Sequence, residues 1–310
     1  GILLALGIAI IIVAATDSTR ESMIWRGDFP GFYGPAVMVA RGLGADLYNF
    51  TLQGVVQNEM WPSFGGDFYI SVYPPHVAVL LAPLALPTAD MAKLFATLFL
   101  LITAVASIII VLRAFNLEAP WQLVAFVIML PPIFVSVLSA QNTACTMLLC
   151  ALCVSLLASH RRNASVLMGV SAAILMYKPQ FGIPLLIFCT ALRGTPVLWG
   201  AAPLLALWYL VGAMTVGILW PIELFKAGAE FARINHELNF HNFVSLEAFI
   251  RLMAGSWLGN VPLIAGALSV VLFAWLVWIL YCGRQCSTKV QMLRLSVSCG
   301  SLPILFPQAL

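Results

Sequence analysis

The chain has 310 residues, of which 62% are hydrophobic and only 9% are charged, whereas soluble domains carry about 25% charged residues. This composition excludes a soluble globular protein. Repeated apolar runs near the length of a bilayer crossing instead predict an all-α, multi-pass transmembrane helical bundle. The net charge of +3 is too small to indicate nucleic-acid binding, and the partners expected of such a bundle are membrane lipids.

The seven cysteines do not form a recognisable set of metal ligands. Most lie inside apolar segments, where cysteine behaves as a small hydrophobic residue. The pair Cys282 and Cys286 has no histidine nearby. The sequence therefore indicates neither a divalent metal nor another cofactor.

The first apolar run, residues 1–15, begins without a methionine and is short for a bilayer crossing. We interpret it as a transmembrane helix that lacks its start. We expect one domain, residues 1–310, that continues beyond both ends of this sequence. Within it, two long polar segments predict loops, the first at residues 16–92 and the second at residues 220–260.

The first loop opens on Asp28, which precedes a stretch with apolar side chains at helical spacing up to Ala40. That spacing predicts a short helix lying on the membrane surface. Pro30 suits its first turn, whereas Pro35 removes an interior hydrogen bond. Asp28 then has two interpretations: a helix cap, or a catalytic base at the edge of the bilayer. The apolar stretch at residues 75–86 is too short to cross, so we expect a surface or re-entrant helix there.

The rest of the chain predicts a series of membrane-crossing helices. Pro131 and Pro132 are expected to kink the second of them. In chain order the apolar segments are residues 93–112, 121–138, 143–158, 164–177, 181–192, 197–219, 261–281 and 291–306.

Basic residues orient these helices through the positive-inside rule. If the first loop faces outward and residues 75–86 do not cross, the short cytoplasmic turns contain Arg113, Arg161, Arg162, Arg193, Arg284 and Lys289, opposed by Glu118 alone. The same arrangement gathers one group of polar residues on the outer side: Asp28, Tyr73, Gln141, Asn142, Lys178, His236 and His241. Polar groups clustered at one membrane face suit the binding of a lipid-linked phosphate. We therefore expect a multi-pass protein of a cell (inner) membrane, with its site facing the periplasm or the exterior.

Several short motifs occur in order along nearly the whole chain: Asp28-Phe29, Ala40-Arg41-Gly42, Leu47-Tyr48, Tyr73-Pro74-Pro75, Leu81-Ala82-Pro83-Leu84, Gln141-Asn142, Tyr177-Lys178-Pro179-Gln180-Phe181-Gly182 and the terminal Pro307-Gln308-Ala309-Leu310. Together they resemble glycosyltransferase family 87, the polyprenol-phosphate-mannose-dependent transferases of the GT-C superfamily. The resemblance implies a GT-C-like bundle with surface helices in the first outer loop, and a bacterial origin.

The resemblance implies inverting transfer of a hexose, mannose in this family, from a polyprenyl-phosphate sugar to a lipid or glycan acceptor. Asp28 occupies the position of the family's general base. Lys178 would stabilise the leaving phosphate, although a lysine at a helix end also snorkels to the interface without any binding role. The other expected substrate contacts are Tyr73, Gln141, Asn142, His236 and His241.

Simpler interpretations remain open for several of these contacts. Gln141 and Asn142 also suit a plain turn with a helix cap at Asn142, and His236 and His241 also suit a solvated loop. The competing function is a transporter or flippase of a lipid-linked or small polar substrate. Transporters place ionisable residues near the bilayer midplane and often show internal repeats. Here the predicted spans are nearly free of ionisable residues, which favours chemistry at the membrane interface.

Overall fold

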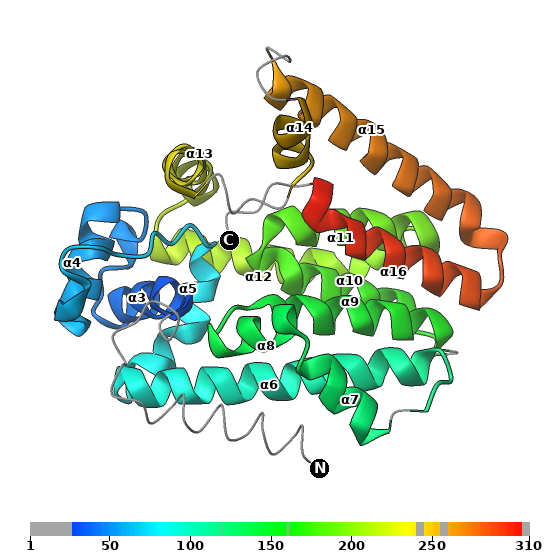
Figure 1. Ribbon diagram of the computed structural model, residues 1–310, viewed down its shortest axis with the longest axis horizontal. Helices are drawn as coiled ribbons and strands as arrows, with labels where there is room; N and C mark the ends of the chain where they lie inside the picture. Colours follow the sequence, from blue (N-terminus) through cyan, green and yellow to red (C-terminus); the bar gives the residue numbers. More distant parts are fainter. Residues whose placement is uncertain (1–26, 119, 160, 240–244, 255–259, 306–310) are drawn as a thin grey trace. The chain divides into compact units, whose positions relative to one another are not determined.

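The computed structural model describes residues 27–118, 120–159, 161–239, 245–254 and 260–305. These residues form helices and contain no strand, which confirms the predicted all-α helical bundle (Figure 1). The chain divides into two compact units, which we describe separately. Unit 1 comprises Gly1–Leu152 and Ala206–Leu224, and unit 2 comprises Cys153–Leu205 and Phe225–Leu310. The helix predicted at residues 1–15 lies outside the described residues.

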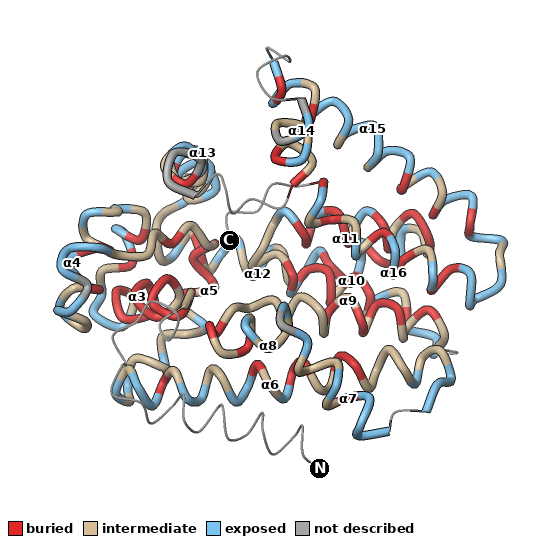
Figure 2. Tube along the Cα trace, in the orientation of Figure 1, coloured by how far each residue is buried: buried red, intermediate tan, exposed pale blue. Residues whose placement is uncertain are grey.

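Unit 1 is built around the helix α3, Phe29–Ala40, which contacts α4, α5 and the short 3₁₀ helix η3. Nine of its twelve residues are buried, and α3 is mostly red, the colour of buried residues, in Figure 2. The helix therefore occurs where the spacing of apolar residues predicted it, but most of its surface packs against protein rather than against a membrane. The elements of the first loop are α3, η1 (Gly44–Asp46), α4 (Phe50–Met60), η2 (Pro62–Phe64), α5 (Pro75–Leu81) and η3 (Ala82–Ala85).

Unit 1 continues through a long helix, α6, Ala89–Ala114. The span predicted at residues 121–138 is instead two helices, α7 (Trp121–Ile128) and α8 (Pro131–Leu138), which meet at a bend of 72°. The bend follows from Pro131, because the residue before a proline avoids the helical conformation. Leu130 accordingly has an extended ψ of 131°.

Unit 2 is organised around α11, Pro179–Arg193, which contacts α10, α15 and α16. Two glycines bring α10 close to α12: a Cβ at Gly169 would lie 1.9 Å from the Val197 oxygen, and one at Gly200 would lie 2.0 Å from the Val166 oxygen. Small residues at such crossings are typical of helices packed in membranes. The elements that lie wholly in this unit are α10 (Ala164–Ile174), η4 (Leu175–Tyr177), α11, α14 (Leu246–Ala254), α15 (Val261–Cys282), η7 (Gly283–Gln285) and α16 (Thr288–Leu305).

Three further helices contribute residues to both units: α9 (Thr143–Ala158), α12 (Pro196–Thr215) and α13 (Trp220–Asn239). Among the described helices, α6, α12 and the stretch of α15 with η7 are long and apolar enough to cross a membrane, and the bent pair α7–α8 would be a fourth if it counts as one span. The helices predicted near residues 143–158, 164–177 and 181–192 are present, but each has at most 17 residues, fewer than the roughly 20 that a crossing needs. The predicted final span, α16, is not among the described helices that are long and apolar enough to cross a membrane.

Candidate active site

Asp28 is fixed at the start of α3 by a contact with a distant part of unit 1. Its backbone N–H donates to the Ser139 carbonyl oxygen at 3.0 Å, at the end of α8. Gly27 permits this approach because a Cβ there would lie 2.4 Å from the same oxygen, and because its φ is +46°. The first loop is thereby joined to the turn that carries Gln141 and Asn142.

The side chain of Asp28 does not cap α3, although the residue occupies the N-cap position. Its backbone has helical angles, φ −81° and ψ −4°, whereas a capping residue normally has an extended backbone from which its side chain reaches back to the helix. The capping interpretation of Asp28 is therefore wrong in this structure.

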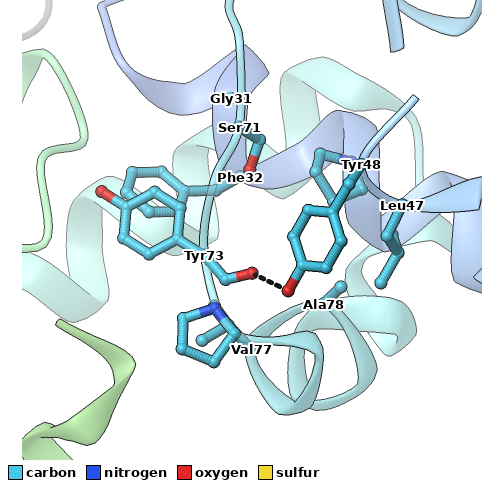
Figure 3. A pocket seen from close by; sticks show the side chains of 10 residues that line it. Gly31, Phe32, Leu47, Tyr48, Ser71, Tyr73, Val77 and Ala78 are labelled. Carbon is cyan, nitrogen blue, oxygen red and sulfur yellow. Dashed lines mark hydrogen bonds between the residues drawn. The ribbon is translucent and has the colours of Figure 1, made fainter. Parts of the chain in front are cut away.

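Within unit 1, Tyr73 interacts with both Asp28 and Asn142. Burial raises the pKa of the Tyr73 phenol, the negative charge of Asp28 raises this pKa further, and a hydrogen bond from the Asn142 side chain lowers it. The phenol is therefore protonated at neutral pH and retains an O–H donor. The ring of Tyr73 packs against Phe32 of α3, with centroids 4.7 Å apart (Figure 3).

Two buried glutamines of α4 hold the segment that leads to Tyr73. The Gln57 side chain accepts from the Tyr69 N–H and donates to the Tyr69 oxygen, both at 2.8 Å. The Gln53 side chain accepts from the Ser71 N–H at 2.8 Å and donates to the oxygens of Ser71 and Leu47 at 2.9 and 2.7 Å. The Tyr48 hydroxyl donates to the backbone carbonyl oxygen of Tyr73 at 3.1 Å (Figure 3). Side chains of the first loop thus supply the backbone hydrogen bonds that a neighbouring strand would otherwise give to this segment.

Gln53→Leu is expected to lower the free energy of unfolding by about 2–4 kcal/mol, because it leaves buried backbone groups of Ser71 and Leu47 without partners. Thermal unfolding of the purified protein in detergent measures the loss. The matched control is Gln122→Leu, because Gln122 is exposed on α7 and this change should leave the transition nearly unmoved. Equal transitions for the two variants would show that the Gln53 contacts do not stabilise the loop.

A small cavity lies between α3, α5 and the segment at Tyr73, and Figure 3 shows its lining. Its volume is about 10 Å³, which is room for at most about one water molecule. A sugar does not fit inside it. The cavity is therefore a gap in the packing behind Tyr73, and substrate would have to approach Asp28 and Tyr73 from elsewhere.

His76, the second residue of α5, is buried with 3% of its surface exposed. Its ring stacks on Trp208 of α12, within unit 1, with centroids 4.6 Å apart and planes 11° apart. Neither ring nitrogen has a hydrogen-bond partner among the described residues. Burial lowers the pKa of His76 from 6.5 to about 4, so the ring is neutral at physiological pH.

Acidification should destabilise unit 1 through His76. The unfolded chain takes up a proton below pH 6.5, whereas the folded ring does so only near pH 4. The stability that the neutral ring contributes is therefore fully present above pH 6.5 and is lost as the pH falls towards 4. The loss approaches about 3 kcal/mol. Thermal unfolding between pH 7.5 and 4.5 measures it, and His76→Phe, which still stacks on Trp208, should remove this part of the acid sensitivity. An unchanged pH profile in the Phe variant would contradict the assignment.

The remaining predicted residues are placed as follows. Gln141 lies in the turn before α9, where its side-chain oxygen accepts from the Ser136 hydroxyl at 3.0 Å. Lys178 belongs to unit 2; it directly precedes α11 and is half-buried, with its Nζ 6.0 Å from the centroid of the Phe181 ring. His236 lies in α13, but its side chain is outside the described part of the structure, as is the whole of His241. The structure thus brings together Asp28, Tyr73 and Asn142.

Four residues that hold this group in place were not predicted from the sequence: Gly27, Gln53, Gln57 and Ser139. A signal for the glutamines was present, because residues four apart lie on the same face of a helix and Gln53 and Gln57 share that face with the small Gly54. Ser139 gave no signal, since its role rests on a backbone oxygen. In the described parts of the chain, no three His, Cys, Asp or Glu side chains gather as metal ligands would.

These features define an integral-membrane helical protein in which a tyrosine of the first polar loop interacts with an acidic side chain of the same loop and with an asparagine between α8 and α9. The profile of glycosyltransferase family 87 matches residues 71–306, and the chain belongs to this family. The resemblance seen in the sequence is thereby confirmed, and the protein is a glycosyltransferase. The match includes Tyr73, Asn142 and Lys178, whereas Asp28 precedes it. Comparisons with curated proteins and with solved structures found no match.

Proposed function

We propose that the protein transfers a hexose, mannose in the first instance, from a polyprenyl-phosphate sugar to a lipid or glycan acceptor at the outer face of the membrane. The observation that carries this proposal is the placement of Asp28. Its carboxylate is not used as a helix cap, and its charge acts on Tyr73, which Asn142 also contacts. A carboxylate held among hydrogen-bonding side chains suits a general base.

In the proposed reaction an acceptor hydroxyl attacks the anomeric carbon from the face opposite the phosphate. Asp28 takes the hydroxyl proton while the new carbon–oxygen bond forms. The bond between the anomeric carbon and the phosphate oxygen breaks, and the phosphate leaves with the electron pair, so the anomeric configuration inverts. We assign to Lys178 the stabilisation of the negative charge on the leaving phosphate. Tyr73 and Asn142 are assigned the contacts with substrate hydroxyls. Gln141, His236 and His241 are further contacts in the proposal, and it assigns no role to a metal or another cofactor.

The membrane orientation is tested by cysteine labelling of intact cells, after the native cysteines have been replaced. Single cysteines at Asp67, exposed in the first loop, and at Ala229, exposed on α13, should react with an impermeant maleimide. A cysteine at Asn163, exposed at the start of α10, should react only after the cells are opened. Labelling of the Asn163 position from outside would reverse the orientation that the basic turns indicate.

The donor is tested with purified protein in lipid nanodiscs. Polyprenyl-phosphate mannose carrying a ¹³C label is compared with labelled nucleotide mannose, in the presence of a membrane lipid extract as acceptor. Mass spectrometry should find label in products only with the lipid-linked donor, and NMR of the product should show the inverted anomeric configuration. Transfer from the nucleotide sugar alone, or a retained configuration, would overturn the proposal.

A further inference from the structure

A surface groove of about 350 Å³ lies within unit 2 between α11, α12 and α15. Aliphatic side chains form most of it: Leu186 and Ile187 from α11, Leu198 from α12 and Val277 from α15. Two of them are exposed, Ile187 at 37% and Leu198 at 44%. The volume falls within the range of about 300–1,000 Å³ that is common for small-molecule sites.

Tyr281 and Arg284 also line the groove, where α15 ends and η7 begins. The guanidinium of Arg284 lies over the Tyr281 ring, 4.4 Å from its centroid. Its Nε donates to the Ala191 oxygen and its Nη2 donates to the Thr190 oxygen at 3.0 Å, both in the last turn of α11. These bonds fix the guanidinium in place and use two of its five N–H donors. A fixed cation with remaining donors is suited to a phosphate group.

The turns around Arg284 are basic. Arg193 ends α11 and donates to the Leu157 oxygen of α9 at 2.7 Å, which joins the end of α9 to the end of α11. The three turns at this end, residues 159–163, 193–195 and 283–289, contain no acidic residue. Their cations are Arg161, Arg162, Arg193, Arg284 and Lys289. Such a set of cations at a membrane surface attracts anionic lipid headgroups.

We propose that this groove binds one phospholipid with an anionic headgroup, its acyl chain along the aliphatic side chains and its phosphate at Arg284. The stretch of α15 with η7 is long and apolar enough to cross a membrane, and Arg284 lies at its end. The aliphatic part of the groove then lies at the depth of lipid chains and Arg284 at the depth of headgroups. This joint arrangement selects a phospholipid over a free phosphate, which would leave the apolar part of the groove empty.

This lipid site is separate from the proposed donor site. Lys178, to which we assign the donor phosphate, precedes the first residue of α11, whereas Arg284 binds the last turn of the same helix. The 15 residues of α11 place these two ends about 20 Å apart. Binding of the phospholipid can therefore be measured independently of binding of the sugar donor.

The test compares phosphatidylglycerol with phosphatidylcholine of the same acyl chains, added to the purified protein in detergent. Native mass spectrometry counts retained lipid, and thermal unfolding reports stabilisation. We expect the wild type to retain phosphatidylglycerol preferentially, and Arg284→Gln to weaken its affinity roughly tenfold or more. The matched control is Lys289→Gln, an exposed cation at the start of α16 that does not line the groove, and it should keep the preference.

A second variant separates lipid binding from folding, because Arg284 also binds α11. Leu198→Trp fills the groove from an exposed position and leaves Arg284 intact; it too should lose the retained phosphatidylglycerol. The proposal would be overturned if the wild type retained both lipids equally. It would also be overturned if Lys289→Gln lost as much phosphatidylglycerol as Arg284→Gln, or if Arg284→Gln and Leu198→Trp both retained it fully. A dimer that forms without lipid and dissociates in Leu198→Trp would show that a second copy of the chain occupies the groove instead.

Discussion

Asp28→Asn is expected to lower the rate of sugar transfer by about 10²–10⁴-fold, the range that a general base contributes. Asparagine keeps the size of the side chain but cannot accept the hydroxyl proton. Because the Asp28 side chain makes no cap to α3 and its contact with Ser139 runs through the backbone N–H, the substitution should leave the fold intact. The expected variant is folded, binds the lipid-linked donor and transfers almost nothing.

Donor binding, thermal unfolding and turnover should be measured on the same preparation, since only their separation identifies a base. The matched control is Asp46→Asn, because Asp46 is an exposed acid of the same loop, in η1. It should retain nearly full activity. If Asp28→Asn keeps more than roughly a tenth of wild-type transfer, the base is another acid, and Glu237 in α13 is the next to replace.

Lys178→Gln is expected to slow transfer by roughly 30- to 150-fold, which corresponds to about 2–3 kcal/mol for a charge-assisted contact with the leaving phosphate. The loss should appear in turnover rather than in stability. Lys178 is half-buried with its Nζ near the Phe181 ring, and a glutamine can keep much of that packing.

Single-turnover rates with bound donor isolate the effect of Lys178 on the chemical step. Lys289→Gln, an exposed lysine at the start of α16, controls for the loss of one positive charge. Activity of Lys178→Gln within about twofold of wild type would assign Lys178 to snorkelling at the membrane interface.

The sequence allowed good prediction of local structure and of the membrane class. Apolar spacing placed α3 within one residue of its observed bounds, and the prolines at 131 and 132 marked the break between α7 and α8. It did not give the severity of that break, because a kinked span and two helices at 72° share the same local pattern. Burial of α3 was also missed, since periodicity cannot distinguish a protein neighbour from a lipid one.

For the site, the sequence placed Asp28, Tyr73 and Asn142 on one side of the membrane but gave no contact between them. Their proximity depends on long-range backbone bonds such as Asp28 to Ser139, which leave no mark on composition or spacing. Lys178 was predicted on the same side of the membrane from topology alone. The prediction that it stabilises the leaving phosphate rests on the family motif.

The glutamines of α4 give the first loop a register, as in a β-ladder. They bind the backbone of Tyr69 and Ser71, and Tyr48 binds the backbone of Tyr73. Every second residue of this segment is therefore hydrogen-bonded through its backbone to a side chain of the first loop. One residue added or removed between Ser71 and Tyr73 would exchange the two faces of the chain. The phenol would then turn away from Asn142 although no residue of the site had changed. The length of this loop is thus as much a determinant of the site as the identity of Tyr73.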